Sequence, residues 1–106
     1  MTTQTSDSRL VPVMQYETPT TGATINVGTN GNVKLLINPS GSLLNLTLSL
    51  PSAPSDGDLI SFCSSQIVTT FTMTNGTIIG ALTTLAVATF ASYIYSATAS
   101  KWFRIG

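Results

Sequence analysis

Residues 43–50 read Leu-Leu-Asn-Leu-Thr-Leu-Ser-Leu, and this stretch decides the fold class. From position 44 onward a leucine occupies every second position, so the leucines share one face and the polar residues between them share the other. This period of two is typical of a half-buried β-strand and predicts that Leu44, Leu46 and Leu48 lie in the core or in a subunit interface. Leu43 interrupts the polar face, which indicates a bulge or a subunit contact.

Short apolar runs bounded by turn residues continue on both sides of this strand. Upstream, residues 24–27 and 33–37 are predicted strands, separated by the turn signal Gly28-Thr-Asn-Gly-Asn32. Asn75-Gly76 predicts a β-hairpin. The predicted strands downstream are 59–63, 67–74, 77–79, 85–88, 90–96 and 101–105. Because no segment has helical periodicity, we expect an all-β fold, a compact antiparallel β-sandwich or barrel-like domain.

Residues 1–16 differ from the rest of the chain, and we expect them to form an extended N-terminal arm before a single domain at 17–106. Pro12 cannot donate a ladder hydrogen bond, and it biases Val11 toward extended backbone. Two interpretations of the arm stay open. It is either a disordered tail or a segment that docks on a neighbouring subunit or another protein.

Charged residues make up only 8% of the 106 residues, with four Lys and Arg, four Asp and Glu, and no His. An ordinary domain has roughly 25% charged residues. Four scattered cations exclude nucleic-acid binding by phosphate neutralisation, and the lack of histidine excludes a Ser-His relay. Polarity comes instead from 18 Thr, 13 Ser and 6 Asn. Because few charges protect the strand edges, we expect an obligate homo-oligomer.

We expect no enzyme activity, cofactor or metal site. Asp56 and Asp58 flank Gly57 and could offer oxygens to a cation, but a Pro-Ser-Asp-Gly turn explains them more simply. Cys63 lies in an apolar run and is interpreted as a small buried hydrophobic residue. The uncharged run 78–95 has the length of a membrane span, but its composition favours strands. We therefore expect neither membrane insertion nor a signal peptide.

Aromatic residues gather near the C-terminus. Tyr93 and Tyr95 are two residues apart and therefore project from one face of a strand, and Trp102 and Phe103 lie on the last strand. Such a ladder could stack against a sugar, but aromatic residues more often form core or subunit interface. Core or interface is the interpretation that we favour for them, and also for Phe71, which lies in the alternating strand 67–74.

Several motifs follow one another along residues 18–106. They are Asn38-Pro-Ser-Gly41, Leu46-Thr-Leu-Ser-Leu-Pro51, Pro54-Ser-Asp-Gly-Asp58, the Thr-rich strand 68–74, Ile79-Gly80, Thr84-Leu85, Tyr93-x-Tyr95 and Lys101-Trp-Phe-Arg104. In this order they resemble the small β modules of tailed-bacteriophage virion proteins, which occur in head decoration and head-fibre proteins and at the tips of tail fibres. The resemblance implies a non-enzymatic module that forms a homotrimer.

The chain has no coiled-coil or collagen-like shaft, which favours a capsid decoration protein over a fibre tip. We expect synthesis in the host cytoplasm and docking on the major capsid protein of the assembled head, where the protein stabilises the virion. The expected shell contacts are Arg9, Leu10, Val11, Val13, Met14 and Tyr16. The alternative is a receptor- or glycan-binding tip that uses the loop 28–32 or the Tyr93 and Tyr95 ladder on a host surface glycan. A small membrane protein ranks below both.

Overall fold

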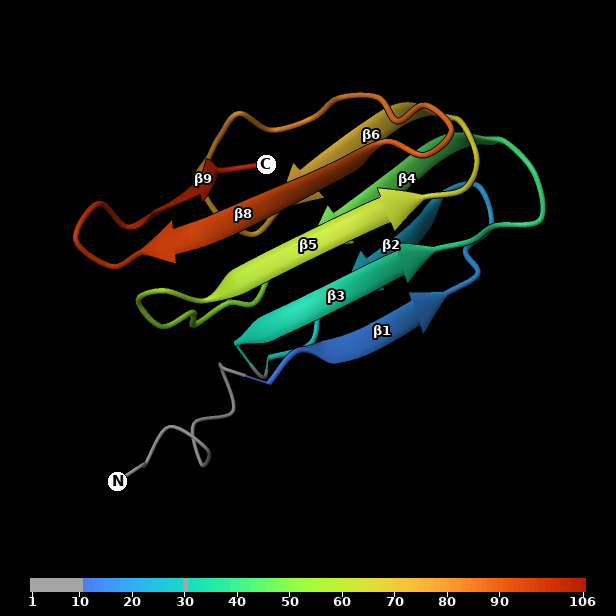
Figure 1. The fold of residues 1–106 in the computed structure, drawn as a ribbon. Coiled ribbons are helices and arrows are strands. Elements are labelled where there is room, and N and C mark those ends of the chain that lie inside the picture. The colour runs from blue at the N-terminus through green and yellow to red at the C-terminus, as the bar shows by residue number, and fades with distance from the viewer. Residues whose placement is uncertain (1–10, 30) are drawn as a thin grey trace.

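A computed structural model describes residues 11–29 and 31–106, which fold into two facing β-sheets (Figure 1). Six strands form sheet A in the order β1-β3-β5-β8-β9-β7, and three form sheet B in the order β2-β4-β6. The strands are β1 (Val13–Glu17), β2 (Ala23–Asn26), β3 (Asn32–Ile37), β4 (Leu43–Ser49), β5 (Leu59–Ser64), β6 (Val68–Thr74), β7 (Ile78–Ile79), β8 (Phe90–Ser96) and β9 (Lys101–Arg104).

The first six strands coil like a short solenoid. The chain alternates between the sheets, so β1, β3 and β5 stack in parallel in sheet A while β2, β4 and β6 stack in parallel in sheet B. Val13 pairs with Val33, which in turn pairs with Ile60, so equivalent inward positions lie above one another. After three coils β8 runs antiparallel to β5, and β9 runs antiparallel to β8.

The all-β prediction is confirmed, but the antiparallel sandwich or barrel is wrong. Alternation identifies which residues face inward, but it does not show which strands pair with one another or in which direction. The parallel pairing was therefore missed. Asn75 has the positive φ, 68°, that a tight turn needs. The turn nevertheless carries the chain from β6 in sheet B to β7 in sheet A, where β7 pairs in parallel with β9. It therefore forms no hairpin.

Two further boundaries differ from the sequence analysis. The expected arm extended to residue 16, yet Val13–Glu17 is strand β1, paired with β3 over its whole length. Residues 85–88 are no strand; Leu85 makes a single antiparallel bridge to Val68 beside β6. The run 78–95 contains β7, a connection and β8. Within the described ranges there is no helix with the length and hydropathy that crossing a membrane requires.

Apolar side chains fill the space between the sheets. Phe62 lies at the centre, with ring centroids 5.5 Å from Phe71 and 6.0 Å from Tyr93. Trp102 packs against Tyr95, with their ring centroids 5.3 Å apart. The largest fully buried side chains include Trp102, Tyr93, Leu35, Ile37, Leu46, Leu48, Leu50, Ile60, Leu85, Val33 and Val68. Burial of this kind is the main driving force for folding, and every coil contributes to it.

The bulge indicated near Leu43 is absent, because β4 and β6 pair in one unbroken register from Leu43 with Val68 to Ser49 with Thr74. Leu43 is 6% exposed and faces the core, whereas Leu44 is 67% exposed and faces outward. The backbone N–H groups of Leu44 and Asn45 both donate to the Thr21 hydroxyl, at 3.1 and 3.2 Å. Leu44 and Asn45 are both exposed, and so are Thr69 and Thr70 at the matching positions of β6, so the alternation is interrupted on both strands without an extra residue on either. Alternation with inward leucines resumes at Leu46.

Candidate interaction surface

The outer face of sheet A carries an apolar row at one end of its strands. In register across the sheet, Tyr16 pairs with Leu36, Leu36 with Cys63, and Cys63 with Phe90. Phe90 is 68% exposed and Tyr16 is 55% exposed, and Leu36 is also exposed. We call Tyr16, Leu36, Cys63 and Phe90 the first apolar row. It covers four neighbouring strands, β1, β3, β5 and β8, and gives them a continuous hydrophobic edge.

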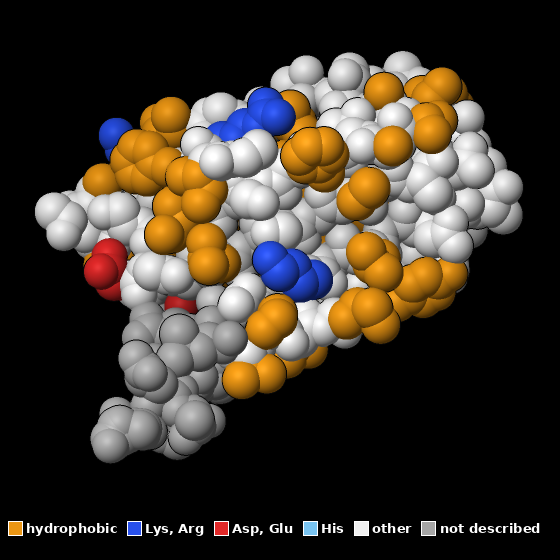
Figure 2. All heavy atoms as spheres, in the orientation of Figure 1, with side chains coloured by type: hydrophobic (Ala, Val, Ile, Leu, Met, Phe, Trp, Pro, Cys, Tyr) orange, Lys and Arg blue, Asp and Glu red, His pale blue; other side chains and the backbone are white. Residues whose placement is uncertain are grey.

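A second apolar row crosses the other end of the same face. Leu59 pairs with Ile94, Ile94 with Phe103, and Phe103 with Ile79. Ile79 is exposed and the other three side chains are half-buried. We call these four residues the second apolar row. Hydrophobic side chains are spread over much of this face, with few charges between them (Figure 2).

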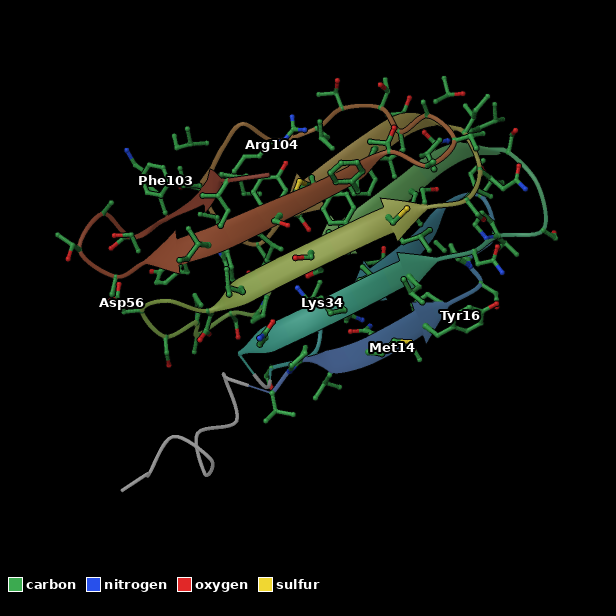
Figure 3. The ribbon with its side chains drawn as sticks, viewed as in Figure 1. Met14, Tyr16, Lys34, Asp56, Phe103 and Arg104 are labelled. Carbon is green, nitrogen blue, oxygen red and sulfur yellow. The ribbon has the colours of Figure 1, made fainter. Side chains whose placement is uncertain are left out.

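A polar row separates the two apolar rows. Lys34 pairs with Ser61, which pairs with Ser92. The Lys34 ammonium donates to the Ser61 hydroxyl at 3.4 Å, and the Ser61 and Ser92 hydroxyls are 2.9 Å apart. At the outward positions of β1, β3, β5 and β8, Lys34 is the one charged residue. Figure 3 places it near the middle of the sheet, with Met14 and Tyr16 on the neighbouring edge strand.

An open hollow of about 200 Å³ lies between the first apolar row and the polar row. Leu36, Cys63 and Phe90 form its apolar wall, and Lys34, Ser61 and Ser92 lie along its polar side. Cys63 is a free, half-buried thiol. The hollow therefore combines apolar walls with a single positive charge.

The outer face of sheet B has a different chemistry. Its strands pair Thr24 with Thr47 and Thr47 with Thr72, so three threonines form a ladder across the sheet. In the part of the chain that the structure describes, none of their three hydroxyls has a hydrogen-bond partner. The other outward residues on β2, β4 and β6 are mainly Asn, Ser and Thr, with Leu44 as an apolar exception. This face is uncharged and hydroxyl-rich.

Gln15 closes the open end of the coil, and sequence reasoning missed it. Its position pairs with fully buried Leu35, so the side chain faces the space between the sheets. Its amide nitrogen donates to the backbone oxygen of Asn26 at 2.8 Å and to the Glu17 carboxylate at 3.0 Å. The backbone N–H of Gly28 donates to the Gln15 side-chain oxygen at 2.9 Å. The side chain therefore satisfies backbone groups beside edge strand β2.

The predicted arm residues divide between described and undescribed parts of the chain. Met14 and Tyr16 are exposed on the outer face of sheet A, at its β1 edge. Val13 is 48% exposed although it pairs with the buried Val33, and Val11 precedes the strand and is exposed. Arg9 and Leu10 lie outside the described residues.

The residues predicted as core or interface also divide. Leu46, Leu48, Phe71, Tyr93 and Trp102 are buried between the sheets. Tyr95 is half-buried and packs on the core, Leu44 is exposed on the outer face of sheet B, and Phe103 belongs to the second apolar row.

Tyr93 is fully buried, so it cannot form the exposed sugar-stacking ladder that was considered for it. Its hydroxyl donates to the backbone oxygen of Gly80 at 2.8 Å. Burial raises the pKa of Tyr93 above the usual 10.0, and the positive charge of Arg104 opposes this shift. The proton is therefore held more tightly in the folded protein than in an exposed tyrosine.

The two aspartates around Gly57 serve the turn. Asp58 is buried and accepts a hydrogen bond from the Ser55 backbone N–H at 2.8 Å. Asp56 accepts one from the Ala97 backbone N–H, also at 2.8 Å, which ties this turn to the β8–β9 connection. Among residues 11–29 and 31–106, no three His, Cys, Asp or Glu side chains come together in a group that could hold a metal ion.

Comparisons with known proteins found no match, either to protein-family models or to curated protein sequences.

Proposed function

We propose that this protein is a non-enzymatic structural component of a bacteriophage virion, a trimeric decoration protein that docks on the assembled head and stabilises it. The observation that carries the proposal is the outer face of sheet A, with two apolar rows and Lys34 as the one charge at the outward positions of β1, β3, β5 and β8. Large exposed apolar patches mark sites of protein–protein interaction. A protein whose main surface feature is such a face acts by binding other proteins.

The two apolar rows suit two different contacts. The second apolar row is uncharged and includes half-buried Ile94 and Phe103, which suits contact between identical copies. The first apolar row continues into the β1 edge, where Met14 and Tyr16 are exposed. These residues belong to the segment expected to touch the shell. A trimer would present three such contacts at once, so weak single contacts would give strong attachment in sum.

Two measurements test the proposal together. Light scattering after gel filtration is expected to give a mass of three chains. Cryo-electron microscopy of purified virions is expected to show trimeric knobs on the head surface. Knobs on the head with the β1 edge toward the shell would support docking by this segment. A monomer in solution, or density confined to the tail tip, would contradict the decoration role.

A receptor- or glycan-binding tip is the second candidate, and the outer face of sheet B favours it. The ladder of Thr24, Thr47 and Thr72 offers hydroxyl groups without partners in the described chain. Rigid β-branched side chains lose little conformational entropy when they bind. Binding to host-cell glycans that is lost in a Thr47→Val and Thr72→Val double variant would support this role. Glycan binding unaffected by these changes would count against the sheet B face.

A further inference from the structure

We infer that the hollow beside the first apolar row is a socket for one apolar side chain of a different protein. The same partner protein places a carboxylate next to Lys34. This inference rests on the proposed function for the identity of that partner, the shell protein of the head. The socket is the point at which the two surfaces interlock, and the rest of the face surrounds it.

The size of the hollow fits one large side chain. Its volume is about 200 Å³, and its apolar wall is formed by Leu36, Cys63 and Phe90. An apolar cavity of roughly 150 Å³ is large enough to hold a benzene ring. A leucine or aromatic side chain in the hollow would cover Phe90 and Leu36, both now exposed to solvent. Binding energy in protein interfaces is concentrated in such apolar pockets.

The charge beside the hollow requires an acidic partner group. Lys34 makes one long hydrogen bond, 3.4 Å to the Ser61 hydroxyl, and forms no ion pair with any other described residue. Covering a lysine ammonium with an apolar surface removes water from the charge, which is costly unless a carboxylate replaces it. The partner segment therefore carries Asp or Glu close to its apolar anchor.

A second copy of this chain fits the socket poorly. Symmetric packing of two such faces would bring positive Lys34 side chains together without an acid on either face. The acidic side chains that the structure describes are already engaged. Glu17 accepts a hydrogen bond from the Gln15 side chain, Asp56 accepts one from the Ala97 backbone N–H, and the buried Asp58 accepts one from the Ser55 backbone N–H. The occupant is therefore a different protein.

The first test is binding of the full-length protein to heads that lack it. Lys34→Glu is expected to weaken head binding by about tenfold or more while the trimer stays intact. The matched control is Lys101→Glu, since Lys101 is exposed on β9 of the same sheet and does not line the hollow. The control is expected to bind within about twofold of the unchanged protein. Equal binding of both variants and the unchanged protein would overturn the socket while leaving the decoration role intact.

A second test fills the socket directly. Cys63 is the one cysteine in the sequence, so N-ethylmaleimide adds a single group to the wall of the hollow. Alkylation is expected to block head binding of the unchanged protein, whereas a Cys63→Ser variant is expected to bind heads to the same extent with and without the reagent. Cys63 is also expected to react more slowly in head-bound protein than in the free trimer. An unchanged rate on heads, or equal protection in the trimer alone, would overturn the inference.

Failure of the proposed function has a different signature. If the unchanged protein does not bind heads at all, the decoration role fails, and with it the shell protein as the occupant. If Lys34→Glu or alkylation instead dissociates the trimer, the occupant is a second copy of this chain and the inference is overturned. Measuring oligomeric mass and head binding on the same samples separates these outcomes.

Discussion

The outer faces of sheet A and sheet B differ in chemistry although alternating strands build both. Inward positions are apolar in both sheets, as Leu35 in β3 and Leu48 in β4 illustrate. Outward positions are largely apolar in sheet A, with Phe90 68% exposed, and are hydroxyl-rich in sheet B, where Thr72 is exposed. The inward residues therefore determine the fold, and the outward residues of sheet A suggest what the protein does.

Destroying the shared core should have the largest effect, because it removes both faces at once. Leu48→Ala deletes a fully buried side chain between the sheets and is expected to lower the free energy of unfolding by about 3–4 kcal/mol. The matched control is Leu44→Ala, four positions earlier on the same strand but 67% exposed, with an expected change within about 0.5 kcal/mol. Urea unfolding measures both, and equal losses would mean that β4 is not oriented as described.

The next largest effect should separate the two faces by their roles in assembly. Phe103→Ser in the second apolar row is expected to weaken the proposed trimer and to raise the protein concentration at which half of it dissociates by tenfold or more, since burying an aromatic side chain contributes about 1.5–3 kcal/mol. Thr72→Ser on sheet B is the control and is expected to leave the trimer unchanged. Sedimentation of both variants over a range of concentrations gives the midpoints. A trimer lost only in Thr72→Ser would reverse the assignment of the faces.

The open end of the coil should give a smaller effect. Gln15→Ala removes the side chain that bonds Asn26 and Gly28 beside β2, with an expected loss of about 1–2 kcal/mol in unfolding free energy. Gln66→Ala is the control, because its side chain makes no hydrogen bond to any described residue. Thermal unfolding compares them. A Gln15 variant as stable as the control would show that solvent satisfies these backbone groups equally well.

The strands were largely predictable and their pairing was not. The alternation at 43–50 located β4 to within a residue, and the dipeptide Asn75-Gly76 marked a turn, at which Asn75 has a positive φ. Both signals are local. Parallel pairing of β4 with β6, in which Leu46 meets Phe71, depends on residues far apart in sequence, and local periodicity carries no information about it.

The candidate surface was predicted only at its edge. Met14 and Tyr16 were expected to make contacts, and both are exposed, Tyr16 within the first apolar row and Met14 two residues earlier on the same strand. Phe90 was not singled out, because it begins a strand inside a long uncharged run where both faces carry large apolar or aromatic side chains, so the sequence does not mark which face is outward. Gln15 was missed for a related reason. A polar side chain at an inward position becomes informative only once the register with Leu35 is known.

The smallest expected effect concerns Tyr93, and it tests whether the Tyr93 hydroxyl is excluded from water in the core between the two sheets. Because burial raises its pKa, the folded protein keeps the phenol proton at a pH where the unfolded chain has begun to release it. The unfolded state therefore binds fewer protons, so stability is undiminished below about pH 10 and falls as pH rises from there through the folded-state pKa. Tyr93→Phe loses the hydrogen bond to Gly80, which lowers stability by about 1 kcal/mol at neutral pH, but it removes this pH dependence. Urea midpoints measured from pH 8 to 11 should thus converge for the two proteins as pH rises. Parallel curves would mean that the Tyr93 hydroxyl is hydrated in the folded state and that the core is open at this position.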